Sequence, residues 1–132
     1  MANASGSVSS YFIDETATPV VLANAVSANA TAVCWLVANK AATFAYVANT
    51  GPSTLSLMRL GNGGSVQLVG NVTTGNLQGP ADEALSADDR HLYVRNGGNQ
   101  SLSIYTVNAD GSLTAQPSLY GLPAGANGVV AR

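Results

Sequence analysis

Short apolar runs alternate with polar turns along the whole chain, and this pattern repeats every 47 residues. The tetrapeptide Tyr-Val-Ala-Asn at 46–49 recurs as Tyr-Val-Arg-Asn at 93–96, and Thr-Leu-Ser-Leu at 54–57 recurs as Ser-Leu-Ser-Ile at 101–104. The same offset relates Gly64-Ser65 to Gly111-Ser112. A period of about 20 to 50 residues made of short apolar runs is typical of stacked units of strands, as in a propeller or a solenoid.

One period, 79–125, contains four strand-like runs, which we place at 81–86, 91–95, 101–107 and 112–116. A polar turn at 87–90 separates the first two runs, and a Gly- and Asn-rich connection at 96–99 separates the next two. Before the fourth run, Asp110-Gly111 is a strong hairpin signal, because this pair tolerates the positive φ that a tight turn requires. Each period is therefore predicted to be a four-stranded antiparallel meander.

The third run of each period has apolar residues of both parities, at 55, 57, 58 and 60 in one copy and at 102, 104, 105 and 107 in the next. A strand with one face in water keeps strict alternation, so we expect either burial on both faces or a bulge that shifts the register. Sheets that are packed between two neighbours are the blades of a propeller. No helical periodicity competes with this interpretation.

We therefore predict an all-β fold, a single domain at 1–132 that forms a partial β-propeller of about 2.75 four-stranded blades. Its units are a blade part at 1–31, blades at 32–78 and 79–125, and a closing strand at 126–132. This count gives eleven strands where three blades need twelve, and closed propellers typically have about 4 to 8 blades. We expect the open faces to be covered by further blades of a longer propeller or by other copies in a homo-oligomer.

Composition limits the partners and cofactors. Only 9% of the residues are charged and the net charge is −2, so we expect no binding to nucleic acid or to a membrane surface. With His91 as the only histidine and Cys34 as the only cysteine, the chain has no set of metal ligands, and we expect neither a metal nor another cofactor. The first residues lack the features of a signal peptide, so either the chain stays inside the cell or its export signal lies upstream of Met1.

Three stretches carry a family resemblance. They are Pro-Ala-Asp-Glu-Ala-Leu-Ser-Ala-Asp-Asp-Arg-His-Leu-Tyr-Val-Arg-Asn at 80–96, Ser-Leu-Ser-Ile-Tyr-Thr-Val-Asn-Ala-Asp-Gly-Ser-Leu-Thr at 101–114, and Gly-Leu-Pro-Ala-Gly-Ala-Asn-Gly-Val-Val-Ala-Arg at 121–132. Here the chain resembles the C-terminal portion of lactonase-type seven-bladed β-propellers, the 6-phosphogluconolactonase and muconate-cyclase-like family. Surface-layer repeat propellers share the Tyr-Val-Ala-Asn form, so the resemblance indicates the fold much more specifically than the function.

The catalytic residues of that family do not carry over to this chain. Enzymes of the family typically have an Arg-His pair after the Pro that opens the inner strand of a blade, whereas Ala81 and Asp82 follow Pro80 here, and Cys34 and Trp35 stand one period earlier. We therefore expect a fragment that is not catalytic alone and that assembles with other copies or with the missing blades. The alternative is a lactone hydrolase or cycloisomerase acting on a small acidic sugar or aromatic lactone.

Three residues are candidates for binding a small-molecule ligand at the channel. Trp35 could form a pocket wall or be buried against the neighbouring blade. Asp82 could act as a base or be a solvated charge at the end of a loop, and Glu83 beside it must point to the opposite face of the sheet. Arg95, next to the loop that follows the second strand, could pair with an acidic ligand.

Four other residues have structural interpretations. Cys34 is expected to be a small core residue, because no base lies near it in sequence to make it a nucleophile. His91 is expected to be a partly exposed strand residue. Asn49 and Asn96 recur at the end of the second strand, and we assign them to a turn, since a ligand site usually breaks the internal symmetry of a repeat.

Overall fold

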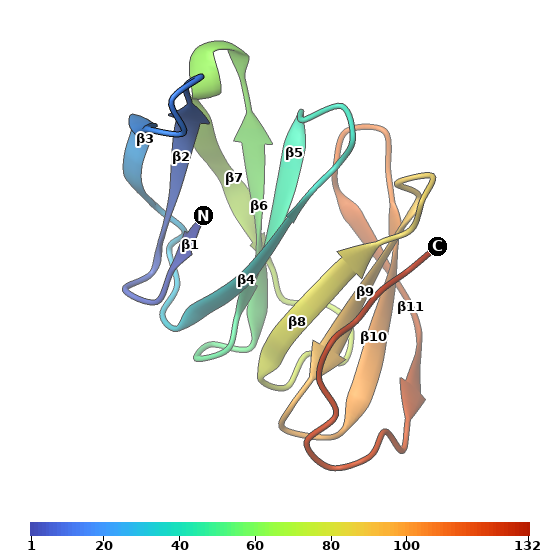
Figure 1. Ribbon diagram of the computed structural model, residues 1–132. Helices are drawn as coiled ribbons and strands as arrows, with labels where there is room; N and C mark the ends of the chain where they lie inside the picture. The colour runs from blue at the N-terminus through green and yellow to red at the C-terminus, as the bar shows by residue number, and fades with distance from the viewer.

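The computed structural model describes all residues, 1–132, as three antiparallel sheets that stand side by side (Figure 1). Blade 1 contains β1 (Ala2–Asn3), β2 (Ser7–Ile13) and β3 (Pro19–Ser27). Blade 2 contains β4 (Val33–Ala38), β5 (Phe44–Asn49), β6 (Thr54–Leu60) and β7 (Val66–Val72). Blade 3 contains β8 (Pro80–Leu85), β9 (His91–Asn96), β10 (Ser101–Val107) and β11 (Leu113–Tyr120). A short 3-10 turn, η1 (Asn62–Gly64), joins β6 to β7. The structure contains no helix with the length and apolar character that a membrane-spanning helix requires.

The strands of the repeat lie where the sequence pattern predicts them, and within each blade every strand pairs with the next one along the chain. The outermost strand β11 is longer than expected because it continues through Pro117 to Tyr120. A proline is compatible with an edge strand, where its missing N–H faces solvent. The all-β partial propeller predicted from the 47-residue period is thus confirmed.

The two ends of the chain differ from the prediction. The residues before β2 form an additional short strand, β1, and the ladder continues through Met1, whose carbonyl accepts from the Ser9 amide at 2.9 Å. The predicted closing strand at 126–132 is not a strand, because residues 121–132, which we call the tail, have no ladder partner. The tail instead runs beside β8 and β9 (Figure 1).

The third strand of blade 2, β6, is buried on both faces, which is the first of the two alternatives that its apolar pattern left open. Leu55, Ser56, Leu57 and Met58 are all buried, because β6 has a neighbouring blade on each face. The β6–β7 ladder also has a register shift between Leu57 and Met58. The extra residue of this shift, Val69, lies on β7, so β6 itself alternates regularly and burial on both of its faces accounts for its apolar residues at odd and even positions.

The hydrophobic core therefore lies between the blades. The cluster between blades 1 and 2 consists of Val8, Ala28, Val33, Ala45, Val47 and Met58. The cluster between blades 2 and 3 consists of Tyr46, Ala48, Leu55, Leu57, Leu77, Leu92, Val94 and Tyr105. Each blade is thus stabilised mainly by its neighbours, since it buries apolar side chains on a face only when another blade covers that face.

A buried polar contact joins blade 2 to the connection that precedes it. The Asn49 amide donates to the Ser56 hydroxyl at 2.8 Å, and Ser56 donates to the carbonyl of Ala28 at 2.9 Å. All three residues are buried. Because an unpaired buried carbonyl or amide is costly, this chain of hydrogen bonds fixes how the connection enters the blade.

The same contact recurs one period later, and we call it the Asn–Ser lock. Asn96 donates to Ser103 at 2.8 Å, and Ser103 donates to the carbonyl of Asn76 at 2.8 Å. In blade 1 Asn3 donates to Ser9 at 3.1 Å. The structural role expected for Asn49 and Asn96 is confirmed, and it extends from the end of a strand to the joint between two blades.

Removing the hydroxyl of the lock is expected to destabilise the protein. In Ser103→Ala the carbonyl of Asn76 and the amide of Asn96 both lose a buried partner, which should lower the free energy of unfolding by about 1–3 kcal/mol. Urea unfolding followed by circular dichroism measures the change. Ser118→Ala, on the outer strand β11, serves as the control and should change stability by no more than about 0.5 kcal/mol. Equal effects for the two variants would contradict a structural role for the lock.

Candidate functional site

The first strands of blades 2 and 3, β4 and β8, lie next to each other and carry the predicted site residues. By the 47-residue offset, Trp35, Asp82 and Val129 are equivalent, and the side chains of Trp35 and Asp82 point toward the unit that follows their blade. The next residues along, Leu36 and Glu83, point toward the preceding blade, because adjacent residues of a strand face opposite sides. The two acidic side chains of β8 therefore belong to different environments, as the sequence predicted.

Asp82 is held by the tail. Its side chain is buried, at 6% exposure, and its Oδ2 accepts hydrogen bonds from the backbone amides of Gly128 at 2.7 Å and Val129 at 2.8 Å. The alternative of a solvated charge at the end of a loop is therefore wrong. The carboxylate takes the place of a strand partner for the tail and fixes it against blade 3.

Trp35 forms one wall of a cavity of about 420 Å³. Its side chain is 48% exposed, so the alternative of burial against the neighbouring blade is wrong. The cavity is lined by Trp35, Ala81, Asp82, Asn127, Gly128 and Val129. An indole ring and a carboxylate thus border the same space, although Oδ2 of that carboxylate already has two donors.

Arg95 lies on the same face of blade 3 as Asp82, because the two residues are direct cross-strand partners in the β8–β9 ladder. It lines a neighbouring cavity of about 270 Å³ together with Leu102, Leu122 and the tail at 126–130. No ion pair joins Arg95 to Asp82, since the salt bridge of the structure is an exposed contact at 3.9 Å between Arg90 and Asp88. The three predicted site residues therefore gather around the tail, with Asp82 between the other two.

Glu83 is the residue whose environment sequence reasoning missed. Its side chain is 1% exposed, and neither carboxyl oxygen has a hydrogen-bond partner. Burial, and then the charge of Asp82, raise the pKa of Glu83 well above its ordinary value, and the nearby amides of Val37 and Ala48 lower it by less. The burial of Glu83 therefore favours the protonated, neutral form of its carboxyl group.

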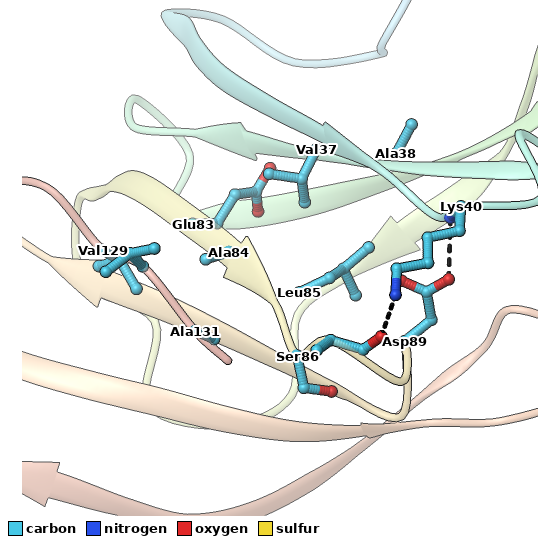
Figure 2. Close-up of a pocket in the computed structure, with 12 residues that line it drawn as sticks. Val37, Ala38, Lys40, Glu83, Ala84, Leu85, Ser86, Asp89, Val129 and Ala131 are labelled. Atoms are coloured by element: carbon cyan, nitrogen blue, oxygen red, sulfur yellow. Dashed lines mark hydrogen bonds between the residues drawn. The ribbon is translucent and has the colours of Figure 1, made fainter.

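The sequence contains a signal for this burial. The residues equivalent to Glu83 in the neighbouring units are Leu36 and Val130, so the position is aliphatic elsewhere in the repeat. Figure 2 shows Glu83 beside Val37 at a cavity of about 450 Å³ between β4, β8 and the tail. At one end of this cavity the Lys40 amide donates to Asp89 at 2.8 Å.

Two further sequence predictions have different outcomes. Cys34 is exposed, so the prediction of a small core residue is wrong. The β4–β5 register shifts between Val33 and Trp35, which places Cys34 in a bulge, where its sulfur accepts a hydrogen bond from the Thr50 hydroxyl at 3.0 Å. His91 is partly exposed, as expected. No three His, Cys, Asp or Glu side chains lie together in a group that could hold a metal ion.

The fold has counterparts among solved structures, although no protein-family model and no curated protein matches the chain. The periplasmic gluconolactonase of Pseudomonas aeruginosa is similar with a TM-score of 0.75 and 19% identity, over 92% of this chain and 36% of that one. A provisionally assigned 6-phosphogluconolactonase from Bacteroides fragilis gives 0.79 and 15% identity, over 90% and 34%. A protein from Lactobacillus plantarum gives 0.78 and 21% identity, over 90% and 37%.

These similarities confirm that the chain has the fold of lactonase-type propellers. At 15 to 21% identity they show the fold alone. The chain spans about a third of the length of these structures, between 34 and 37%.

The buried carboxyl makes the stability of the protein depend on pH. The pKa of Glu83 is raised in the folded state above its ordinary value of 4.5, so the folded protein binds the proton more tightly than the unfolded chain does. Its contribution to stability is complete below about pH 4.5 and is lost as the pH rises through the folded-state pKa. Glu83→Gln removes this loss, so the urea midpoint of the variant should fall less than that of the wild type as the pH is raised from 4.5.

The matched control is Glu15→Gln, because Glu15 is exposed. This variant should keep the wild-type dependence of the urea midpoint on pH. If Glu83→Gln and Glu15→Gln follow the same pH profile, Glu83 is not the buried proton-binding group.

Proposed function

We propose that this chain is a lactonase-like β-propeller part that is not catalytic alone and that associates through its open blade faces, with other copies or with further blades. The observation that supports this is the exposure of apolar side chains on blade 1. Tyr11 is 37%, Ile13 58% and Val21 51% exposed. The residues equivalent to Tyr11 in the other blades, Met58 and Tyr105, are fully buried against a neighbouring blade.

The arrangement of the site supports the absence of catalysis by the chain alone. Asp82 accepts hydrogen bonds from two backbone amides of the tail and therefore has a structural role. Glu83 is enclosed between blades 2 and 3 and only 1% exposed. The Arg-His pair typical of the resembled enzymes is missing from both inner strands. A base, an acid and an anion-binding group are therefore not assembled at one place in these residues.

Association should be visible in solution. Sedimentation velocity at micromolar concentration is expected to show species heavier than the 13.3 kDa chain, with a mass that grows with concentration. Because the exposed surface is apolar and few residues are charged, the association should persist at about 1 M salt, where surface charges are screened. A single species of 13.3 kDa at every concentration would contradict the proposal.

A lactone hydrolase or cycloisomerase acting on a small acidic sugar or aromatic lactone is the second candidate, and the cavity between Trp35 and Asp82 favours it. The exposed indole could support the apolar face of a lactone ring. Asp82 would act as the base for water or for the substrate, and Arg95 would pair with an acidic group of the substrate. Each of the three residues would then have a separate task.

The purified chain tests this second candidate with a panel that includes 6-phosphogluconolactone and a muconolactone. An enzyme that uses Asp82 as its base should lose about 10²- to 10⁴-fold in rate in Asp82→Asn. Asp110→Asn, in the exposed hairpin of blade 3, should keep the rate. The candidate fails if no lactone opens faster with the protein than without it.

A further inference from the structure

The contact between blades 2 and 3 shows how one unit of this repeat covers the next. Blade 2 contributes Tyr46, Ala48, Leu55 and Leu57, which are between 0 and 6% exposed. The Tyr46 hydroxyl crosses the interface and donates to the carbonyl of Gly111 at 2.8 Å. The interface has two different sides, because the blade 2 side and the blade 3 side consist of different residues of the repeat.

Blade 3 presents the first of these sides again on its outer face. The equivalents of the four blade 2 residues are Tyr93, Arg95, Leu102 and Ile104. All four are partly exposed, whereas the blade 2 residues are buried. Leu119, the cross-strand partner of Leu102, is 55% exposed on the same face. This face is therefore the same kind of surface as the one that blade 3 covers on blade 2, with Arg95 in place of an alanine.

Blade 1 presents the second side on its outer face. Tyr11 is equivalent to Tyr105, which packs in the interface from the blade 3 side. Ile13 is equivalent to Val107, which packs against the same cluster. Val21 is the cross-strand partner of Tyr11 and adds to the same face. The two outer faces of one chain thus correspond to the two halves of an interface that the chain already forms internally.

The tail extends this correspondence to the backbone. Asn127 is equivalent to Val33 and Pro80, which pair with the last residues of β5 and β9. The equivalent of those last residues in blade 1 is Asn3 of β1, because it pairs with Ser7 as Asn49 pairs with Thr54. In this structure β1 pairs only with β2 and has its other edge unpaired. In the register of the other blades, an incoming blade 1 would therefore place Asn3 opposite Asn127 and Ala2 opposite Val129.

We propose that copies of this chain associate head to tail, with the outer face of blade 3 of one copy on the outer face of blade 1 of the next, and with Val129 opposite Ala2. The proposal rests on the proposed function and names its partner as a second copy. The interface is heterologous, so it forms a ring if the rotation per copy closes and a filament if it does not. The tail remains on Asp82 and serves as the inner strand of the incoming blade.

Two variants test the two faces separately. Ile13→Asp places a charge on the outer face of blade 1, and Leu119→Asp places one on the outer face of blade 3. Both side chains are more than half exposed, so we expect both variants to fold. Each variant alone should associate on the order of 100-fold more weakly than the wild type, because a charge must lose its water in the contact. Val69→Asp, on the equally exposed strand β7 of blade 2, should associate like the wild type.

Mixing the variants distinguishes head-to-tail contacts from symmetric ones. The mixture of Ile13→Asp and Leu119→Asp retains one intact pair of faces and should form a 1:1 heterodimer and nothing larger. If either variant alone still associates as the wild type does, the head-to-tail interface is overturned while the proposed association stands. If the wild type does not associate at all, both are overturned.

Cross-linking tests the register. In a Cys34→Ser background, Ala2→Cys in one copy and Val129→Cys in another should form an intermolecular disulfide, since directly opposed residues of antiparallel strands lie within disulfide reach. The pair Ala2→Cys and Arg132→Cys lies out of register and is the control. A disulfide that forms no faster between positions 2 and 129 than between 2 and 132 overturns the proposed pairing.

Discussion

Each blade of this protein must be covered on both faces, and the rest of the structure depends on this constraint. A single four-stranded sheet cannot bury the apolar side chains that point to its two sides, so the core forms between sheets and not within one. Blade 2 alone satisfies the requirement, and its strands β5 and β6 contribute to both clusters. Blades 1 and 3 are each covered by a neighbouring blade on one face only, so their outer faces keep apolar side chains exposed.

The sequence predicts most of the fold because the signals that define it are local. Turn residues such as Asp110-Gly111 and the 47-residue offset place the strands without any knowledge of their neighbours. The ends of the chain are less predictable, because strand formation there depends on a partner. The tail has the sequence of a first strand, yet it forms no ladder, since no second strand lies beside it.

The candidate site could be located from the sequence but its environments could not. Trp35, Asp82 and Arg95 do gather around the tail. The alternation of apolar and polar residues does not reveal the register shifts between Val33 and Trp35 and between Pro80 and Asp82. The first of these shifts places Cys34 in an exposed bulge. The two carboxyl groups of β8 also differ in their hydrogen bonds, because Asp82 accepts from two backbone amides and Glu83 has no hydrogen-bond partner. Comparison of equivalent positions across the repeat is the signal that anticipates this difference.

The Asn–Ser lock also bears on how the chain folds. Each serine contacts the connection that leads into its own blade, so the lock can close only after the preceding blade has delivered that connection. Each of these contacts joins residues less than one 47-residue period apart, so the coupling runs from unit to unit, as in a one-dimensional chain of coupled segments. Such a chain opens from its ends. Blade 1, with a two-residue β1 and the most exposed apolar strands, is therefore where amide hydrogens should exchange first, well below the energy of global unfolding.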